Sequence, residues 1–244
     1  GMEPQAAPED PVGAPVPGWR PAARPLRRDL SGRWAALEAL APWEHAAGLF
    51  DAFAEDRAGR NWTYLPYGPF PAFESFRDWL EAECTGDDPL FYAVRDLRSG
   101  LPLGMASYLR IAPAAGAIEI GHLNFAPALA RSRTATEALI LMIGHAFDLG
   151  YRRVEWKCDA LNARSRRAAE RLGLAFEGLF RQAAVVKGRN RDTAWYAAID
   201  GDWPRLSAAY EAWLDPANFD GDGRQRRALS TLTAGDARAA AAEA

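Results

Sequence analysis

The chain has 244 residues, enough to bury a hydrophobic core in one large domain or two small ones. Apolar residues make up 49% of the chain and charged residues 25%, so collagen, coiled coil and wholesale disorder are excluded. Basic residues number 29 and acidic residues 32, which gives a formal net charge of −3. This charge offers no electrostatic case for a nucleic-acid partner or an anionic membrane surface.

The longest apolar run, ALILMIG from Ala138, is far shorter than the ~20 residues of a membrane span, so we expect no membrane association. Cys84 and Cys158 lie far apart and only three histidines are present, so we expect neither a disulfide framework nor a metal. Residues 1–28 contain seven prolines instead of the apolar centre of a signal peptide, which indicates a cytoplasmic protein. Composition leaves open whether the chain is a monomer or a homodimer.

The organisation along the chain predicts three parts. Residues 1–30 form a proline-rich lead segment that is extended or disordered, because proline fixes φ and removes backbone donors. Residues 31–220 form a single domain, within the usual size range. Residues 221–244 are a C-terminal extension whose alanine-rich end lacks an apolar face and is expected to fray.

The first half of the domain alternates between strand and helix patterns. Its expected elements are a strand at 35–40, helices at 42–53 and 72–84, and strands at 90–95, 103–111 and 117–125. The last three strands are separated by SGLP and APAAG, which are turn sequences, so they predict an antiparallel meander.

The second half begins with a helix at 134–149, whose apolar residues recur at i, i+3, i+4 and i+7 and which ends at Gly150. The further expected elements are strands at 154–159, 175–181 and 193–200 and helices at 162–172 and 203–214. The order predicts an α+β fold.

The start of the 134–149 helix is a candidate phosphate site. Its free backbone N–H groups and positive dipole end would face an anion, with Arg131 and Arg133 beside them. The alternative is an arginine-bearing loop on a solvated surface.

Other polar residues have a structural and a functional interpretation. Asn162 is a preferred helix cap, and Ser165 follows it at a capping position. Glu119 lies on the strand face opposite Ile118 and Ile120, where it projects into a cleft as a base or faces water. His122 is expected on the face of Ile118 as a core or wall histidine.

Five segments in order, within residues 119–204, which make up more than a third of the chain, resemble the GNAT superfamily of acetyl-CoA-dependent N-acetyltransferases, and within it the RimJ/RimL-like branch. These segments are EIGH (119–122), TATEAL (134–139), GYRRVEWKCDALNARSRRAAERLG (150–173), FEGLFR (176–181) and KGRNRDTAWYAAIDGDWP (187–204).

The resemblance implies a mixed, mainly antiparallel sheet flanked by helices, in which strands 117–125 and 154–159 splay apart to form the acetyl-CoA cleft. It implies direct attack of a primary amine, on a protein N-terminus or a small molecule, on the thioester of acetyl-CoA. The alternative is a catalytically impaired coenzyme A-binding module with a regulatory or assembly role.

The resemblance also assigns roles to residues. Glu119 matches the base, acting through water, and Ser165 matches the group that protonates the thiolate, with Tyr196 or solvent as alternatives. Asn162 would hold the pantetheine arm or the helix start. The remaining expected cofactor contacts are Phe125, Arg131, Arg133, Thr134, Ala135 and Thr136.

Two departures from the family pattern affect this expectation. Ala130 and Arg133 stand where the phosphate loop has a polar residue and a glycine, and only Ala135 fits. Arg133 would therefore need free backbone donors without glycine's conformational range, or would contact phosphate through its guanidinium, more strongly than Arg131. Ala169 stands where many relatives carry a tyrosine.

The acceptor walls are expected from the first helices and late loops, which are rich in aromatic residues. These aromatic residues form either a hydrophobic acceptor pocket or part of the core. They are Trp43, Trp62, Tyr64, Tyr67, Phe70, Phe73, Trp79 and Phe91.

Overall fold

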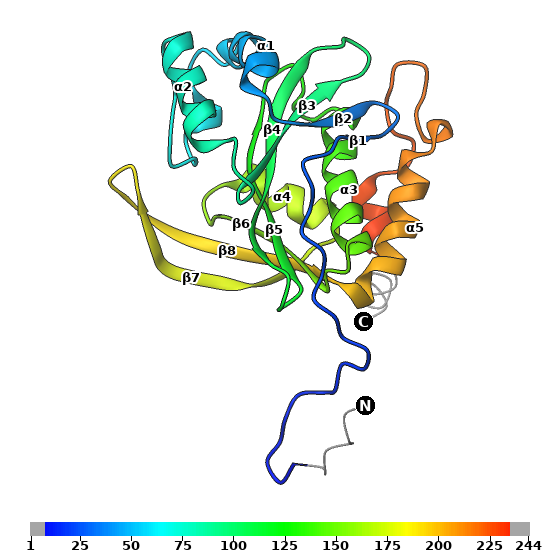
Figure 1. Cartoon of the computed structure of the whole chain (residues 1–244). Helices are drawn as coiled ribbons and strands as arrows, with labels where there is room; N and C mark the ends of the chain where they lie inside the picture. The colour runs from blue at the N-terminus through cyan, green and yellow to red at the C-terminus, as the bar shows by residue number, and fades with distance from the viewer. Residues whose placement is uncertain (1–7, 235–244) are drawn as a thin grey trace.

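The computed structural model describes residues 8–234, and one eight-stranded sheet organises them (Figure 1). The strands lie in the order β1-β2-β3-β4-β5-β6-β8-β7, and every neighbouring pair is antiparallel except β5 and β6. Their bounds are Leu30–Ser31 (β1), Ala35–Ala39 (β2), Leu90–Asp96 (β3), Pro102–Ala112 (β4), Ala117–Phe125 (β5), Arg153–Asp159 (β6), Ala175–Val186 (β7) and Arg189–Ile199 (β8). The predicted α+β class and mixed, mainly antiparallel sheet are confirmed.

Helices cover both faces of this sheet. The helices are α1 (Pro42–Ala54), α2 (Phe73–Glu83), α3 (Arg133–Asp148), α4 (Ala163–Arg171) and α5 (Trp203–Leu214), with short 3₁₀ turns η1 (Arg60–Trp62), η2 (Asp200–Asp202) and η3 (Pro216–Asn218). In Figure 1, α1 and α2 lie on one side of the sheet and α3 and α5 on the other. Contacts agree: Phe91 of β3 packs on Trp79 of α2, whereas the Tyr108 hydroxyl of β4 donates to the Met142 carbonyl of α3.

Helix α3 illustrates how the sequence specifies its own element. Ser132 caps the helix, because its Oγ accepts a hydrogen bond from the amide of Ala135 at 3.1 Å. The apolar stripe is buried, with Ala138, Met142 and Ile143 fully covered. This burial, about 1.5–3 kcal/mol for each large apolar side chain, holds the helix against the sheet.

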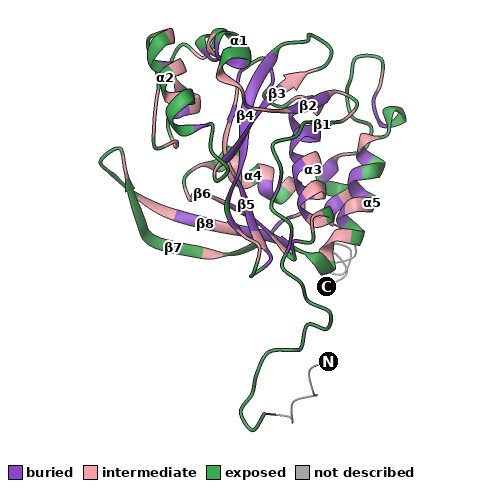
Figure 2. Ribbon diagram, viewed as in Figure 1, coloured by how far each residue is buried: buried purple, intermediate pink, exposed green. Residues whose placement is uncertain are grey.

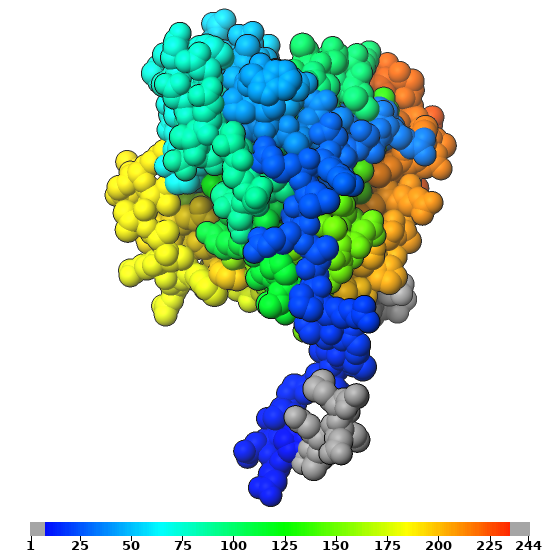
Figure 3. Space-filling model, in the orientation of Figure 1, coloured from blue at the N-terminus to red at the C-terminus, as the bar shows by residue number. Residues whose placement is uncertain are grey.

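The lead segment is extended but contacts the domain. The Ala22 amide donates to the Pro113 carbonyl and the Ala23 amide to the Leu149 carbonyl, and Arg152 lies over the Trp19 ring. In the space-filling view of Figure 3, the lead segment, in dark blue, runs along the surface of the domain. Residues 1–7 and 235–244, which include the end expected to fray, lie outside the described residues.

The β7–β8 hairpin is longer than expected. β7 continues to Val186, although the sequence predicts a strand ending at 181, and β8 starts at Arg189 instead of 193. Nearly all of β7 is exposed, in contrast to the buried β4 and β5 (Figure 2). Among the described residues, no helix is long and apolar enough to cross a membrane.

Candidate functional site

Strands β5 and β6 run side by side and then separate. They pair in parallel from Ala117 and Arg153 as far as Ile120 and Trp156. Beyond this point β5 pairs only with β4, and β6 only with β8. Each strand therefore leaves backbone hydrogen-bonding groups unpaired by the other, and the splay expected for the central strands is present.

Glu119 lies just before the point of separation, in a buried ion-pair cluster. One guanidinium nitrogen of Arg110 is 2.9 Å from both carboxylate oxygens, and Lys157 Nζ is 2.9 Å from Oε1. The side chains of Glu119 and Lys157 are only 5% and 11% exposed. The carboxylate therefore neither faces water nor projects freely, because two cations hold it.

His122 is not on the face predicted by strand alternation. Ser107 pairs with Gly121 and Met105 with Asn124, so β5 has one extra residue here, and His122 has a φ of 51°. This bulge turns the imidazole toward Tyr67 and Phe91, on the α2 side of the sheet. The prediction that His122 shares the face of Ile118 is therefore wrong.

The imidazole of His122 sits in an aromatic environment. Its Nδ1 shares a 2.8 Å hydrogen bond with the Tyr67 hydroxyl, and the Tyr67 ring stacks on it. Burial, with smaller contributions from Arg110 and Arg191, lowers the pKa of His122 from 6.5 to about 4. The ring is neutral at pH 7, with its second nitrogen available as donor or acceptor.

The segment between α1 and α2 spans the separated strands. Asn61 Nδ2 donates to the Phe125 carbonyl of β5 at 2.6 Å, and the Tyr64 hydroxyl donates to the Leu161 carbonyl beyond β6 at 3.3 Å. Lys187, at the β7–β8 turn, donates to the Trp62 carbonyl at 2.7 Å. This segment therefore forms a wall on the α2 side of the separation.

The aromatic residues of this region divide between wall and core. Trp62 is buried and makes edge contacts with its neighbours, whereas Tyr67, Phe70 and Trp79 are half-buried. Trp43 is 86% exposed and belongs to neither group.

Asn162 and Ser165 lie together at the start of α4. Asn162 Oδ1 accepts from the Ser165 amide at 3.2 Å, which is the capping geometry. Trp156 Nε1 donates to Ser165 Oγ at 3.0 Å, so the hydroxyl oxygen acts as acceptor and its own proton can be donated to a neighbour. Cys158 is adjacent: burial raises the pKa of its thiol, and the Ser165 hydroxyl opposes that shift.

Tyr196 is brought to α4 but is differently engaged. It is fully buried on β8 opposite Trp156, and its hydroxyl accepts from Arg166 Nε at 3.1 Å and donates to Glu170 at 3.2 Å. Burial raises its pKa. Its proton is therefore committed to Glu170. Ala169, where the family resemblance led us to look for a tyrosine, is a buried core residue.

The start of α3 offers unpaired donors. The amides of Arg131, Arg133 and Thr134 have no acceptor among residues 8–234, whereas the Ala135 amide is occupied by Ser132. Arg131, not Arg133, adopts the left-handed conformation, with φ of 62°. Arg133 is the first residue of α3, so its amide is free without any glycine-like geometry, which is one of the two alternatives expected for this residue.

The side chains here point in different directions. The Arg133 guanidinium lies over the rings of Trp34 and Phe219, at 4.4 and 5.1 Å from their centroids. Thr134 Oγ1 donates to Asp96, and Thr136 Oγ1 accepts from Arg171. Arg131 is exposed.

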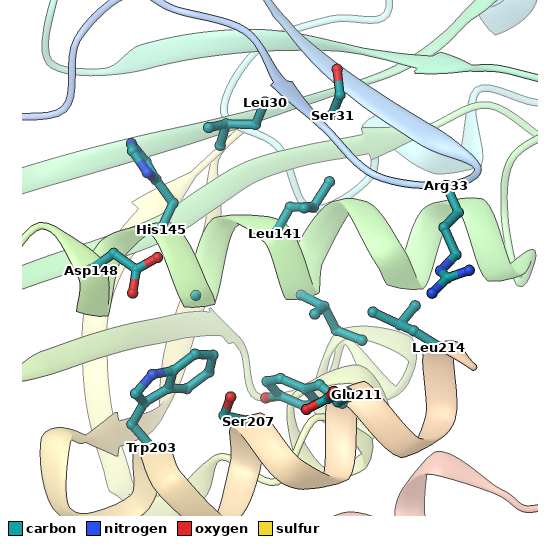
Figure 4. A pocket seen from close by; sticks show the side chains of 13 residues that line it. Leu30, Ser31, Arg33, Leu141, His145, Asp148, Trp203, Ser207, Glu211 and Leu214 are labelled. Atoms are coloured by element: carbon teal, nitrogen blue, oxygen red, sulfur yellow. The ribbon is translucent and has the colours of Figure 1, made fainter.

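Two other features are separate from this site. A groove of about 440 Å³ lies between α3, α5 and β1, with His145, Asp148 and Trp203 among its lining residues, and none of the predicted site residues borders it (Figure 4). Glu38, Glu44 and His45 gather at ligand distances, but Arg95 is 2.8 Å from Glu38 and already supplies the compensating charge.

Several side-chain contacts at the site could not be predicted from the sequence. Arg110 and Lys157 hold Glu119, and Tyr67, which was expected only as an aromatic wall or core residue, shares a hydrogen bond with His122. Asn124 and the Trp195 indole nitrogen are buried polar groups without a partner among residues 8–234. Of these residues, only Lys157 is distinguished in the sequence, because it is one of only two lysines in the chain.

Comparisons with known proteins agree with this architecture. A family model described as an acetyltransferase (GNAT) domain matches residues 37–175. A solved GCN5-related N-acetyltransferase from Brucella melitensis is 45% identical, with a TM-score of 0.87, over 89% of this chain and 99% of that one. A probable GNAT-family acetyltransferase from Chromobacterium violaceum ATCC 12472 is 44% identical, with a TM-score of 0.73, over 83% and 100%.

A more distant structure, the Microcin C7 self immunity acetyltransferase MccE in complex with acetyl-CoA and AMP, shares the fold. It is 18% identical, with a TM-score of 0.61, over 69% of this chain and 93% of that one. No curated protein matches the chain. The family model spans more than half of the chain, and a solved relative well above 30% identity covers most of it. The chain therefore belongs to the GNAT acetyltransferases.

Proposed function

We propose that this acetyltransferase moves the acetyl group of acetyl-CoA to a primary amine, on a protein N-terminus or a small molecule, as a RimJ/RimL-like enzyme of the cytoplasm. The observation that carries the proposal is the separation of β5 from β6 after Ile120 and Trp156, flanked by the starts of α3 and α4. The unpaired strand edges suit the amide groups of a pantetheine arm. The free amides at the start of α3 suit its diphosphate.

In this reaction the amine nitrogen attacks the thioester carbon, a tetrahedral oxyanion forms, and the C–S bond breaks to release the coenzyme A thiolate. Backbone donors at the strand separation would stabilise the oxyanion. Ser165 would protonate the thiolate, since Trp156 engages only its oxygen; the Cys158 thiol is the competing acceptor for the serine proton. Tyr196 is the weaker donor, because its proton goes to Glu170.

Two side chains compete for the role of base. Glu119, acting through water, remains our proposed base; because Arg110 and Lys157 already occupy its oxygens, the water reaches the carboxylate only when one of these two cations moves away. His122 is the alternative, because it is neutral and only partly engaged. A proton must leave the ammonium before attack, and either group can accept it.

The diphosphate would lie against the amides of Arg133 and Thr134, with the exposed Arg131 side chain beside it. Arg133 would contribute its amide, since its guanidinium is held over Trp34 and Phe219. Asn162 would fix the start of α4 against the pantetheine arm. Phe125, Ala135 and Thr136 complete the proposed lining. No metal is required by this chemistry.

Cofactor binding and turnover are tested separately. Acetyl-CoA at 100 times its Kd should stabilise the folded chain by about 2.7 kcal/mol, which a thermal melt detects. Release of free thiol in the presence of a panel of primary amines then separates an enzyme from a coenzyme A-binding module. Stabilisation without thiol release for any amine would favour the binding module, and absence of both would contradict the proposal.

The base is identified with two variants. Glu119→Gln should lower kcat by ~10²–10⁴ at pH 7, with a smaller effect at high pH where the amine deprotonates unaided, and with acetyl-CoA affinity nearly unchanged. His122→Asn should leave most of the rate. If the larger loss occurs in His122→Asn, the base is His122.

A further inference from the structure

Strand register places several polar residues on one face of the sheet beside the separation of β5 and β6. Phe91, which packs on α2, is paired with Ser107 of β4, and Glu119 is paired with Leu109 on the same face. Lys157 contacts Glu119 and lies 3.9 Å from the ring of Trp195, its partner on β8. These side chains therefore all face the segment between α1 and α2, where an acceptor would lie.

Several charges on this face are already paired: Glu155 lies 3.1 Å from Arg153 and 4.0 Å from Lys157. Glu119 is already paired with Arg110 and Lys157. Arg191 follows the same face of β8, since its Nε donates to Thr193 Oγ1 at 3.1 Å. The guanidinium of Arg191 is half-buried and makes no ion pair with any carboxylate of residues 8–234.

The carboxylate nearest in register does not neutralise Arg191. Asp159 of β6 is paired with Thr193, but its Oδ1 accepts from the Leu161 amide. The positive field reaches His122, because Arg110 and Arg191 both help lower the pKa of that imidazole. Arg191 therefore has charge and hydrogen-bonding capacity that no carboxylate in the described chain uses.

Two buried polar groups on this face also lack partners. Asn124 is 4% exposed, and neither its side-chain oxygen nor its nitrogen has a hydrogen-bond partner among the described residues. Asn124 pairs with Met105 of β4, and Met105 pairs with Ala93 of β3. Ala93 is two residues from Phe91, so Asn124 lies on the same face of the sheet as Phe91. Trp195 Nε1 is the second such group. A buried polar group of this kind needs a hydrogen-bond partner, and at the strand separation an ordered water or a bound molecule can supply it.

The opposite wall is aromatic. Tyr67 and Trp79 lie 4.3 Å apart between ring centroids, and Phe91 contacts both Trp79 and His122. Such a wall binds an apolar or aromatic body, while the cations select the charge of its polar end.

We propose that the acceptor is a small primary amine with an apolar or aromatic body and a compact anion, carboxylate or phosphate, which pairs with Arg191. This inference rests on the proposed acetyl transfer and names the substrate class.

The test compares amines that differ only in the anion. Phenylalanine is compared with phenylalaninamide, which lacks the anion, and with 1-amino-2-phenylethylphosphonate, which distinguishes a phosphate-type ligand from a carboxylate. In the wild-type enzyme, the better of the two anionic amines, phenylalanine or the phosphonate, should have a kcat/KM at least ten times that of phenylalaninamide. The preference should shrink as NaCl is raised, because salt screens the ion pair.

Variants assign the preference to one side chain. Arg191→Met should reduce the preference to about twofold or less by lowering kcat/KM for the anionic amine only, and Arg191→Lys should retain part of it. Arg20→Met, which removes a charge from the exposed lead segment, should leave the preference unchanged. Equal losses on charged and uncharged amines in Arg191→Met, or a wild-type preference for the amide, would overturn the inference.

A binding assay distinguishes failure of this inference from failure of the proposed function. Thermal melts of wild type and Arg191→Met are compared with coenzyme A plus N-acetylphenylalanine, its phosphonate analogue or N-acetylphenylalaninamide. Added stabilisation by an anionic product in wild type alone supports the inference. Stabilisation by coenzyme A with no further effect of either anionic product refutes it and leaves the proposed function standing. No stabilisation by acetyl-CoA or coenzyme A contradicts the proposed function itself.

Discussion

Replacing Lys157 by methionine tests the buried ion pair at the separation of β5 and β6. The substitution keeps an unbranched apolar stem against Trp195 and removes the charge 2.9 Å from Glu119. Glu119 is 5% exposed, so water cannot take the place of the lost ammonium. A buried carboxylate that loses one partner is strongly destabilising, because its desolvation is no longer compensated.

The expected cost follows from what remains. Removing one partner of a buried pair costs ~3–5 kcal/mol, and Arg110 still donates to both Glu119 oxygens at 2.9 Å. We therefore expect a loss of about 3 kcal/mol for Lys157→Met. The Arg110 side chain is 62% exposed, so Arg110→Met should cost only about 1 kcal/mol.

Urea unfolding of wild type, Lys157→Met, Glu119→Gln and the double variant measures the coupling. The loss of stability in the double variant should be about 2 kcal/mol smaller than the sum of the two single losses, since a neutral glutamine needs no cation. Single effects that add within ~0.5 kcal/mol, or a larger loss in Arg110→Met than in Lys157→Met, would refute the reasoning.

Three further predictions concern other parts of the site. The folded-state pKa of His122 is lowered from 6.5 to about 4, so between these pH values the unfolded chain binds a proton that the folded chain does not. The free energy of unfolding of the wild type should therefore fall by about 3 kcal/mol as the pH is lowered through this window. Urea unfolding of His122→Asn should lack this component. Arg131→Gly should be about 1 kcal/mol more stable in urea than Arg131→Ala, because only glycine adopts a φ of 62° without strain. Glu137→Ala should cost about 3 kcal/mol in the same assay, since the buried carboxylate accepts the amides of Trp34 and Ala35 at 2.7 and 2.9 Å; a cost below 1 kcal/mol would contradict this.

Elements with one buried face could be predicted closely from the sequence. The apolar period predicts a helix at 134–149 and the structure has Arg133–Asp148, and the strand expected at 117–125 has those bounds. When one face of a helix or strand is buried, apolar residues recur with the period of that element. The element can therefore be predicted from the sequence alone.

Elements without a buried face could not be predicted in the same way. β7 is exposed along most of its length, so no alternation marks its continuation to Val186. β1 has only two residues, too few for any period. Both strands depend on pairing with a neighbour, which tertiary structure decides.

The polar site was predicted only in part. Asn162 and Ser165 are three residues apart on one chain segment, so their proximity follows from local geometry. The partners of Glu119 come from β4 and β6, and strand register is not encoded within any single strand. At the bulge the left-handed conformation falls on His122 and not on the neighbouring Gly121, and the bulge reverses the face of the imidazole.

The position of the Glu119 cluster links the fold to the chemistry. Glu119 pairs with Glu155 in the last stretch where β5 and β6 remain together, and Lys157 is the first residue of β6 beyond the last pair. The Lys157 to Glu119 ion pair therefore ties the two strands at the point where they part. A loss of activity in Glu119→Gln alone would not distinguish a missing base from altered strand separation. A missing base predicts that the loss shrinks at high pH and persists in the double variant with Lys157→Met, whereas altered strand separation predicts a loss that is independent of pH and accompanied by weaker acetyl-CoA binding.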